Sequence, residues 1–203
     1  MCREAEFVSH IRNHLKEYGF DLIFGRGKSL NVGRARCDGY FLAEGNYKEI
    51  RVAKGNKHWV NVLAHEYCHF LQWMETTTAQ LKRESRAQFI VHEVSTGYTT
   101  RRWSKRQVTY AFKTIQAMER DCEIRTVKLL KEWSIPFNVD LYIRRANLYV
   151  YMHHMWRIYQ QQASKFDPES SRKIIRMMPN NFRVKTHLIL PEKVKQELSK
   201  AFV

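Results

Sequence analysis

The stretch that most constrains this chain is LAHEYCHFLQW, residues 63–73, which places two histidines and a glutamate in an otherwise apolar segment. A helix over residues 57–76 would be apolar nearly all the way round, as a buried central helix is. Burying polar side chains costs free energy unless something satisfies them. The fold must therefore provide partners for His65, Glu66 and His69 in its interior.

These three residues form the pattern H-E-x-x-H. Each helical residue turns the chain by about 100°, so positions 65 and 69 lie roughly 40° apart on one face. Their imidazoles can converge on one tetrahedral metal ion at about 2.0–2.1 Å. Glu66, at the edge of that face, can reach a metal-bound water as general base. The pattern predicts a zinc (Zn2+) hydrolase site, and the alternative is two core histidines that bond to backbone or carboxylates.

A catalytic zinc site needs a third protein ligand. The segment MERDCEIR, residues 118–125, offers Glu119 and Glu123 four residues apart on one helical face. We expect Glu119 to bind the metal and Glu123 to hold the Nδ1–H group of a ligand histidine. Glu93 is the rival ligand, and an exposed acidic face in a basic protein is the structural alternative. Cys68 and Cys122 flank the proposed ligands and are expected to be small buried residues, with a thiol that ligates or regulates the metal as the alternative.

The sequence HEYCH followed by ERDCE in a second helix resembles the gluzincin metallopeptidases, whose pattern is H-E-x-x-H with a downstream E-x-x-x-[D/N/E]. More narrowly, residues 4–133 resemble the ImmA/IrrE-like peptidases and the metallopeptidases of tailed phages. In ImmA/IrrE-like relatives the second motif reads approximately E-x-E-A-[N/D]-x-F-A, and Glu123 stands where Asn or Asp is usual, so Glu123 is a further candidate for the third ligand. The resemblance implies a zinc-dependent peptidase with His65, His69 and Glu119 as ligands and Glu66 as base.

The resemblance also implies a protein or peptide substrate and a donor for the oxyanion that forms on its carbonyl. In gluzincin-like sites this donor is often a Tyr or a His. The local candidates lie in YVYMHHM, with Tyr149 and His153 foremost and Tyr151 and His154 beside them. We expect the active-site cleft to lie between the sheet edge and the H-E-x-x-H helix, where a substrate strand can pair with the sheet.

The hydrophobic pattern predicts an α+β fold. Residues 4–18 have helical spacing, and residues 19–56 hold most of the glycines and short β-type runs, which favours a small antiparallel sheet with hairpins. The remainder reads as helical, with a peripheral helix and loop over 80–106, a long helix over 106–136 stopped by Pro136, a helix over 138–164, and an extended piece before a short helix after Pro191. We expect a zincin-like catalytic domain over 1–135 and a helical C-terminal extension over 136–203, packed together.

The chain is strongly basic, with 35 Lys and Arg against 20 Asp and Glu and a formal net charge of +15. This charge favours acidic partners, and the basic stretches 101–106 and 170–185 could contact nucleic acid. The alternative function is therefore a nucleic-acid-binding or virion/host-interaction protein with a structural or vestigial metal site. Because no apolar signal region or run of about 18 apolar residues is present, we expect no membrane association and a cytoplasmic location, which is the host cytoplasm for a phage-encoded protein. The pattern leaves the oligomeric state open.

Overall fold

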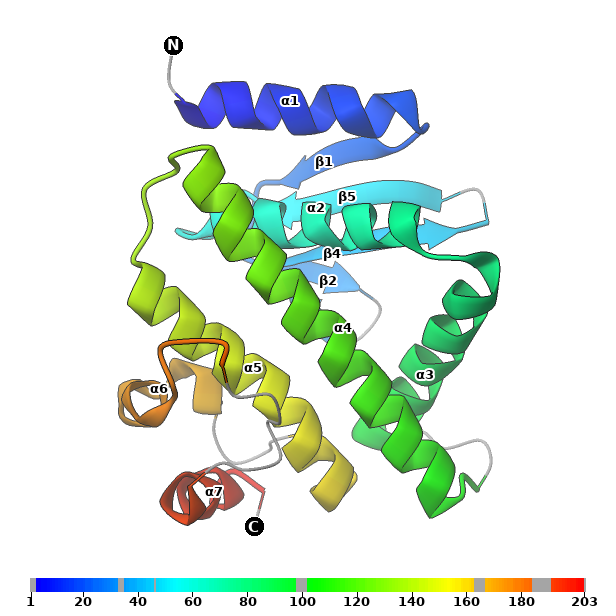
Figure 1. The fold of residues 1–203 in the computed structure, drawn as a ribbon, viewed down its shortest axis with the longest axis vertical. Coiled ribbons are helices and arrows are strands. Elements are labelled where there is room, and N and C mark those ends of the chain that lie inside the picture. The colour runs from blue at the N-terminus through cyan, green and yellow to red at the C-terminus, as the bar shows by residue number, and fades with distance from the viewer. Residues whose placement is uncertain are drawn as a thin grey trace. The chain divides into compact units, whose positions relative to one another are not determined.

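The computed structural model describes residues 3–32, 35–45, 47–97, 102–162, 167–183 and 191–202. It has the predicted α+β class (Figure 1). In chain order its elements are α1 (Arg3–Glu17), β1 (Asp21–Gly25), β2 (Leu30–Val32), β3 (Ala35–Cys37), β4 (Gly39–Glu44), β5 (Tyr47–Ala53), α2 (Trp59–Glu75), α3 (Thr78–Thr96), α4 (Lys105–Glu132), α5 (Val139–Tyr159), the 3-10 helix η1 (Pro168–Ser170), α6 (Arg172–Met177) and α7 (Glu192–Ser199).

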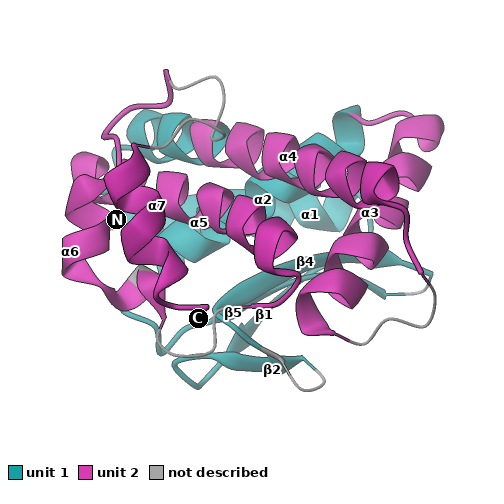
Figure 2. Cartoon of the chain, turned by 90° about the horizontal axis from the view of Figure 1, so that it is seen from below, with its two compact units in different colours: residues 1–75, 125–137 teal, residues 76–124, 138–203 magenta. Residues whose placement is uncertain are grey.

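The chain divides into two compact units (Figure 2). Unit 1 contains residues 1–75 and 125–137, and unit 2 contains residues 76–124 and 138–203. Helix α4 contributes its first twenty residues to unit 2 and the rest to unit 1. The predicted division at 135/136 falls close to one of these boundaries, while residues 76–124 group with the C-terminal residues.

Unit 1 is built on a three-stranded sheet with the order β1-β5-β4. Strands β4 and β5 form the predicted antiparallel hairpin, with Phe41 opposite Ile50. The expectation of a purely antiparallel sheet was wrong, because β1 runs parallel to β5 and Leu22 lies opposite Ile50. A parallel pair needs a long connection, and residues 26–46 provide it. Strands β2 and β3 within this connection form a separate antiparallel pair.

The core of unit 1 lies between its sheet and two helices. Helix α1 buries Phe7, Ile11 and Leu15, which recur every four residues on one face. Helix α2 packs on β4 and β5 (Figure 1). Its Phe70 is fully buried, and the centroid of this ring lies 5.2 Å from that of Phe20. These apolar contacts hold the H-E-x-x-H helix against the sheet.

Helix α4 ends at Glu132, before Pro136. The backbone turns at Ser134, whose φ of 51° is left-handed. The N–H of Ile135 then donates to the carbonyl oxygen of Leu130 at 2.9 Å, which satisfies one of the free carbonyls at the helix end. The predicted stop is therefore confirmed, but the chain leaves the helix a turn before the proline.

Unit 2 is helical. Residues 78–96 form one helix that ends at Gly97, whose φ is 73°. Helix α5 ends five residues before the predicted limit of 164, and the short helix α6 was not predicted. The final helix begins after Pro191 as predicted. The extended piece expected before Pro191 lies outside the described residues.

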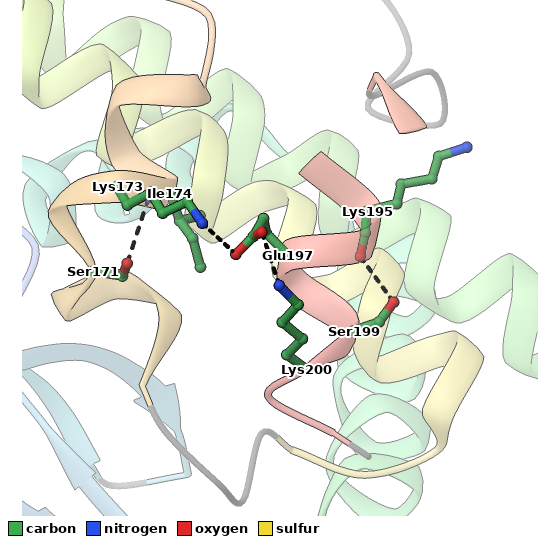
Figure 3. A network of polar contacts seen from close by, with 7 residues as sticks. All are labelled: Ser171, Lys173, Ile174, Lys195, Glu197, Ser199 and Lys200. Atoms are coloured by element: carbon green, nitrogen blue, oxygen red, sulfur yellow. Dashed lines mark hydrogen bonds and ion pairs between the residues drawn. The ribbon is translucent and has the colours of Figure 1, made fainter. Parts of the chain in front are cut away.

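A polar network joins α6 and α7 (Figure 3). The Glu197 carboxylate accepts from the Nζ of Lys200 at 2.8 Å and lies 3.0 Å from the Nζ of Lys173. These two ammonium groups lower the pKa of Glu197. The hydroxyl of Ser171 caps α6 by accepting from the N–H of Ile174 at 3.4 Å. The network fixes the end of the chain to its own unit.

Candidate metal centre

His65 and His69 point toward each other from consecutive turns of α2. Their Nε2 atoms are 3.1 Å apart, and their rings are nearly perpendicular at 88°. Two nitrogens bound to one tetrahedral ion at about 2.0–2.1 Å lie roughly 3.3 Å apart. The side chains of this helix are thus already close to the separation that a shared metal ion requires.

Gln72 orients one of these imidazoles. The Nδ1 of His69 lies 3.0 Å from the side-chain oxygen Oε1 of Gln72, to which it donates. This bond leaves the Nε2 lone pair of His69 available to a metal. In the absence of a metal the Nε2–H of His65 can donate to that lone pair. Sequence reasoning missed Gln72, although its position three residues after His69 on the same helix face was the available signal.

Glu66 lies beside the sheet and is only 8% exposed. Gly39, at the start of β4, passes so close to α2 that an added Cβ would lie 3.2 Å from the Cγ of Glu66 and 2.6 Å from the Cγ1 of Val62. Only glycine allows this approach, because it has no Cβ. Gly39 therefore helps to set where the Glu66 carboxylate lies, and the sequence carried no separate signal for this contact.

Cys37 is a further residue near Glu66 that the sequence did not single out. It lies at the end of β3 with a free thiol. Burial raises the pKa of this thiol most, and the negative charges of Glu66 and Asp38 raise it further. The thiol of Cys37 therefore stays protonated near neutral pH, and Glu66 has an uncharged thiol as its neighbour.

Cys122, which is buried on α4, is a further potential ligand. His65, His69 and Cys122 are a group of side chains that could hold a metal ion. Two imidazoles and a thiolate form a donor set that suits zinc. Sequence reasoning named Cys122 only as an alternative, because a single cysteine without a C-x-x-C partner is a weak ligand signal.

Glu119, the ligand predicted from the sequence, is buried on α4 and is 7% exposed. Its negative charge acts on His153 of α5, where it opposes the stronger effect of burial, which lowers the pKa of that histidine. The Nδ1–H of His153 donates to the carbonyl oxygen of Tyr149 at 3.2 Å. A neutral imidazole with its proton on Nδ1 has no N–H left to stabilise an oxyanion. This bond favours Tyr149 over His153 as the predicted donor.

The other two predicted carboxylates are also buried and hydrogen-bonded within unit 2. Glu123 accepts from the hydroxyl of Tyr142 at 2.6 Å. Glu93 accepts from the indole Nε1–H of Trp103 at 2.7 Å. Glu93 is 3% and Glu123 is 6% exposed, so neither carboxylate belongs to an exposed acidic face.

The remaining aromatic candidates lie on α5 inside unit 2. Tyr151 is fully buried, and burial raises the pKa of its hydroxyl to about 12. His154 is nearly as buried, and burial, Arg157 and Lys195 lower its pKa to about 4. Tyr151 packs in an apolar cluster with residues of α6 and α7, and the ring of His154 lies 5.3 Å from the ring of Tyr151, measured between centroids. Both residues therefore serve the core of this unit.

Comparisons with protein-family models, with curated proteins and with solved structures found no significant match. The resemblance to gluzincins therefore stays a prediction from the motif residues. Among the described residues, no helix is both long enough and apolar enough to cross a bilayer.

Proposed function

We propose that this chain is a zinc-dependent metallopeptidase. The observation that carries the proposal is the 3.1 Å approach of the Nε2 atoms of His65 and His69 on one helix, with the buried Glu66 between them in sequence. In this proposal the third ligand comes from α4, as Cys122 or as Glu119. The substrate is a protein or peptide, as the resemblance to gluzincins implies.

The residues of the chain divide the work of hydrolysis. His65 and His69 would hold the zinc, which when bound would lower the pKa of a coordinated water toward about 7. Glu66 takes the proton of the attacking water and then delivers it to the leaving amine. Tyr149 is the proposed hydrogen-bond donor to the oxyanion.

The sheet supports a docking mode for an extended substrate. Strand β4 is an edge of the three-stranded sheet, and its first residue, Gly39, lies against Glu66. A substrate strand that pairs with a sheet edge forms main-chain hydrogen bonds and needs no particular side chain. Pairing along β4 would bring a peptide carbonyl toward the carboxylate of Glu66.

The test combines metal content with one conservative substitution. The purified protein should contain zinc, and Glu66→Gln should keep the zinc but abolish the formation of new peptide termini in a cell lysate. The matched control is Glu6→Gln, which changes an exposed glutamate of α1 away from β4 and should cleave like the parent. A protein that neither contains zinc nor gains thermal stability when zinc is added would refute the proposal.

A structural metal site is the second candidate. The buried thiol of Cys122 favours it, because closed sites of Cys and His ligands are typical of structural zinc. In that case zinc removal unfolds the protein, while no cleavage depends on Glu66. Comparing the zinc affinity of Cys122→Ser and Glu119→Gln identifies which side chain is the third ligand, because loss of a ligand lowers the affinity far more than loss of a neighbour.

A further inference from the structure

The first part of α4 has a cationic face that the proposed peptidase does not use. Lys105, Arg106, Thr109, Tyr110 and Lys113 line one shallow surface hollow, which we call the α4 basic face. The opposite side of the same helix segment is buried in unit 2, where it contributes residues such as Ala111 and Phe112 to an apolar cluster. This part of α4 is therefore anchored on one side and presents the other to solvent.

The charge of the α4 basic face is uncompensated. Segment 105–113 contains three cations and no acidic residue. Within the described part of the chain, none of these three cations takes part in an ion pair, and all three side chains are exposed. An anionic partner would meet cations that are already free to bind it.

The positions of two cations are unfavourable for the helix itself. Lys105 and Arg106 occupy the first turn of α4, which has no acidic residue. The positive end of the helix dipole lies there, so each cation costs roughly 0.3–1 kcal/mol at an exposed position. The cap is already complete, because Gln107 and Ser104 bond to each other's backbone N–H groups at 3.0 and 3.3 Å. Helix stability therefore does not explain these cations.

Tyr110 adds an aromatic ring to the same face. Its side chain is 56% exposed, which is unusual for a large ring without a partner in the protein core. It lies between Arg106 and Lys113 along the helix. The nine residues from Lys105 to Lys113 are separated by eight helical rises of 1.5 Å, which span about 12 Å. This length corresponds to three or four nucleotides at roughly 3.4 Å each.

We propose that the α4 basic face binds single-stranded nucleic acid, with Lys105, Arg106 and Lys113 contacting phosphates and Tyr110 stacking on a base. Stacking on an exposed ring needs an unpaired base, which is why a single strand fits better than a duplex. The interaction does not require a particular sequence, because every base has a face to stack. This proposal does not depend on the metal centre.

The test measures the fluorescence anisotropy of a labelled oligothymidylate over a range of salt concentrations. In the triple variant Lys105→Gln, Arg106→Gln, Lys113→Gln, the slope of log affinity against log salt should become shallower by about 2, since each phosphate contact contributes roughly 0.7. The matched control neutralises three exposed cations of α3 in the same way: Lys82→Gln, Arg83→Gln and Arg86→Gln. It removes the same charge and should leave the slope nearly unchanged. Circular dichroism melts confirm that each variant is folded.

Two substitutions of Tyr110 test the stacking contact. Tyr110→Phe keeps an aromatic ring and should bind like the parent. Tyr110→Leu should weaken binding by about 5- to 100-fold, which is the effect expected when one base loses its stacking partner. Equal weakening by the α3 and α4 triple variants would overturn the proposed location. An unchanged affinity of Tyr110→Leu, or an equal affinity for duplex DNA, would overturn stacking on a single strand.

Discussion

His154 should make the folded protein less stable in mild acid. It lies on α5, is 8% exposed, and its Nδ1 is 3.3 Å from the guanidinium Nη2 of Arg157, which donates to it. Burial, Arg157 and Lys195 lower the pKa of His154 from its ordinary value of 6.5 to about 4. Each of these effects disfavours the charged imidazolium in the folded protein.

The sign of the effect follows from comparing the two states. Because the folded pKa is depressed, the unfolded chain binds a proton at His154 more readily than the folded chain does. The contribution to stability is complete above pH 6.5 and is lost as the pH falls from 6.5 toward 4. At pH 5, protonation of His154 raises the equilibrium constant for unfolding by a factor of about 30 relative to neutral pH, which is a loss of roughly 2 kcal/mol in stability. Solvent screening of the two cations reduces this to about 1–2 kcal/mol.

The assay is urea unfolding at pH 7 and at pH 5, in EDTA so that metal release does not contribute. The loss of unfolding free energy between the two pH values should be about 1–2 kcal/mol smaller in His154→Gln than in the parent. His92→Gln, which replaces an exposed histidine of α3, is the control and should lose as much as the parent. An identical loss in His154→Gln and in the parent would refute the reasoning, whatever their absolute stabilities.

Three further predictions concern unit 1. Gly39→Ala should destabilise the metal-free protein by about 1–3 kcal/mol in urea, because the new Cβ overlaps the Cγ1 of Val62, and a stability equal to that of the parent would contradict the close packing. Zinc at about 100 times its dissociation constant should stabilise the parent by roughly 2.7 kcal/mol in a thermal melt, whereas His65→Ala should show little of this gain. Phe70→Ala should cost about 3–5 kcal/mol in urea unfolding, because the ring is fully buried among other aromatic residues, and a loss below 1 kcal/mol would contradict that packing.

Local structure was predictable because it depends on neighbours in the chain. The spacing of Phe7, Ile11 and Leu15 places all three on one face of a helix, and the structure buries this face as expected. The hairpin of β4 and β5 follows from two β-type runs joined by a short turn. The approach of His65 and His69 belongs to the same class, since helix geometry alone sets positions four residues apart on one face.

Pairings between distant segments were not predictable in the same way. The parallel pairing of β1 with β5 spans more than twenty residues, and no local pattern distinguishes it from an antiparallel pairing. The low pKa of His154 likewise depends on Lys195, which is forty-one residues away in the sequence. Such contacts come from the way that separate apolar faces are buried together, and this depends on the whole chain.

The sequence by itself determined that two imidazoles and a carboxylate share one turn of a buried helix. Helix periodicity is a property of the backbone, so this part of the site needed no tertiary information. Only the tertiary structure decided that Gly39 lies against Glu66 and that Gln72 orients His69. The physical reason is that ligand choice and side-chain orientation depend on packing and on side-chain rotamers, neither of which a spacing between residues specifies.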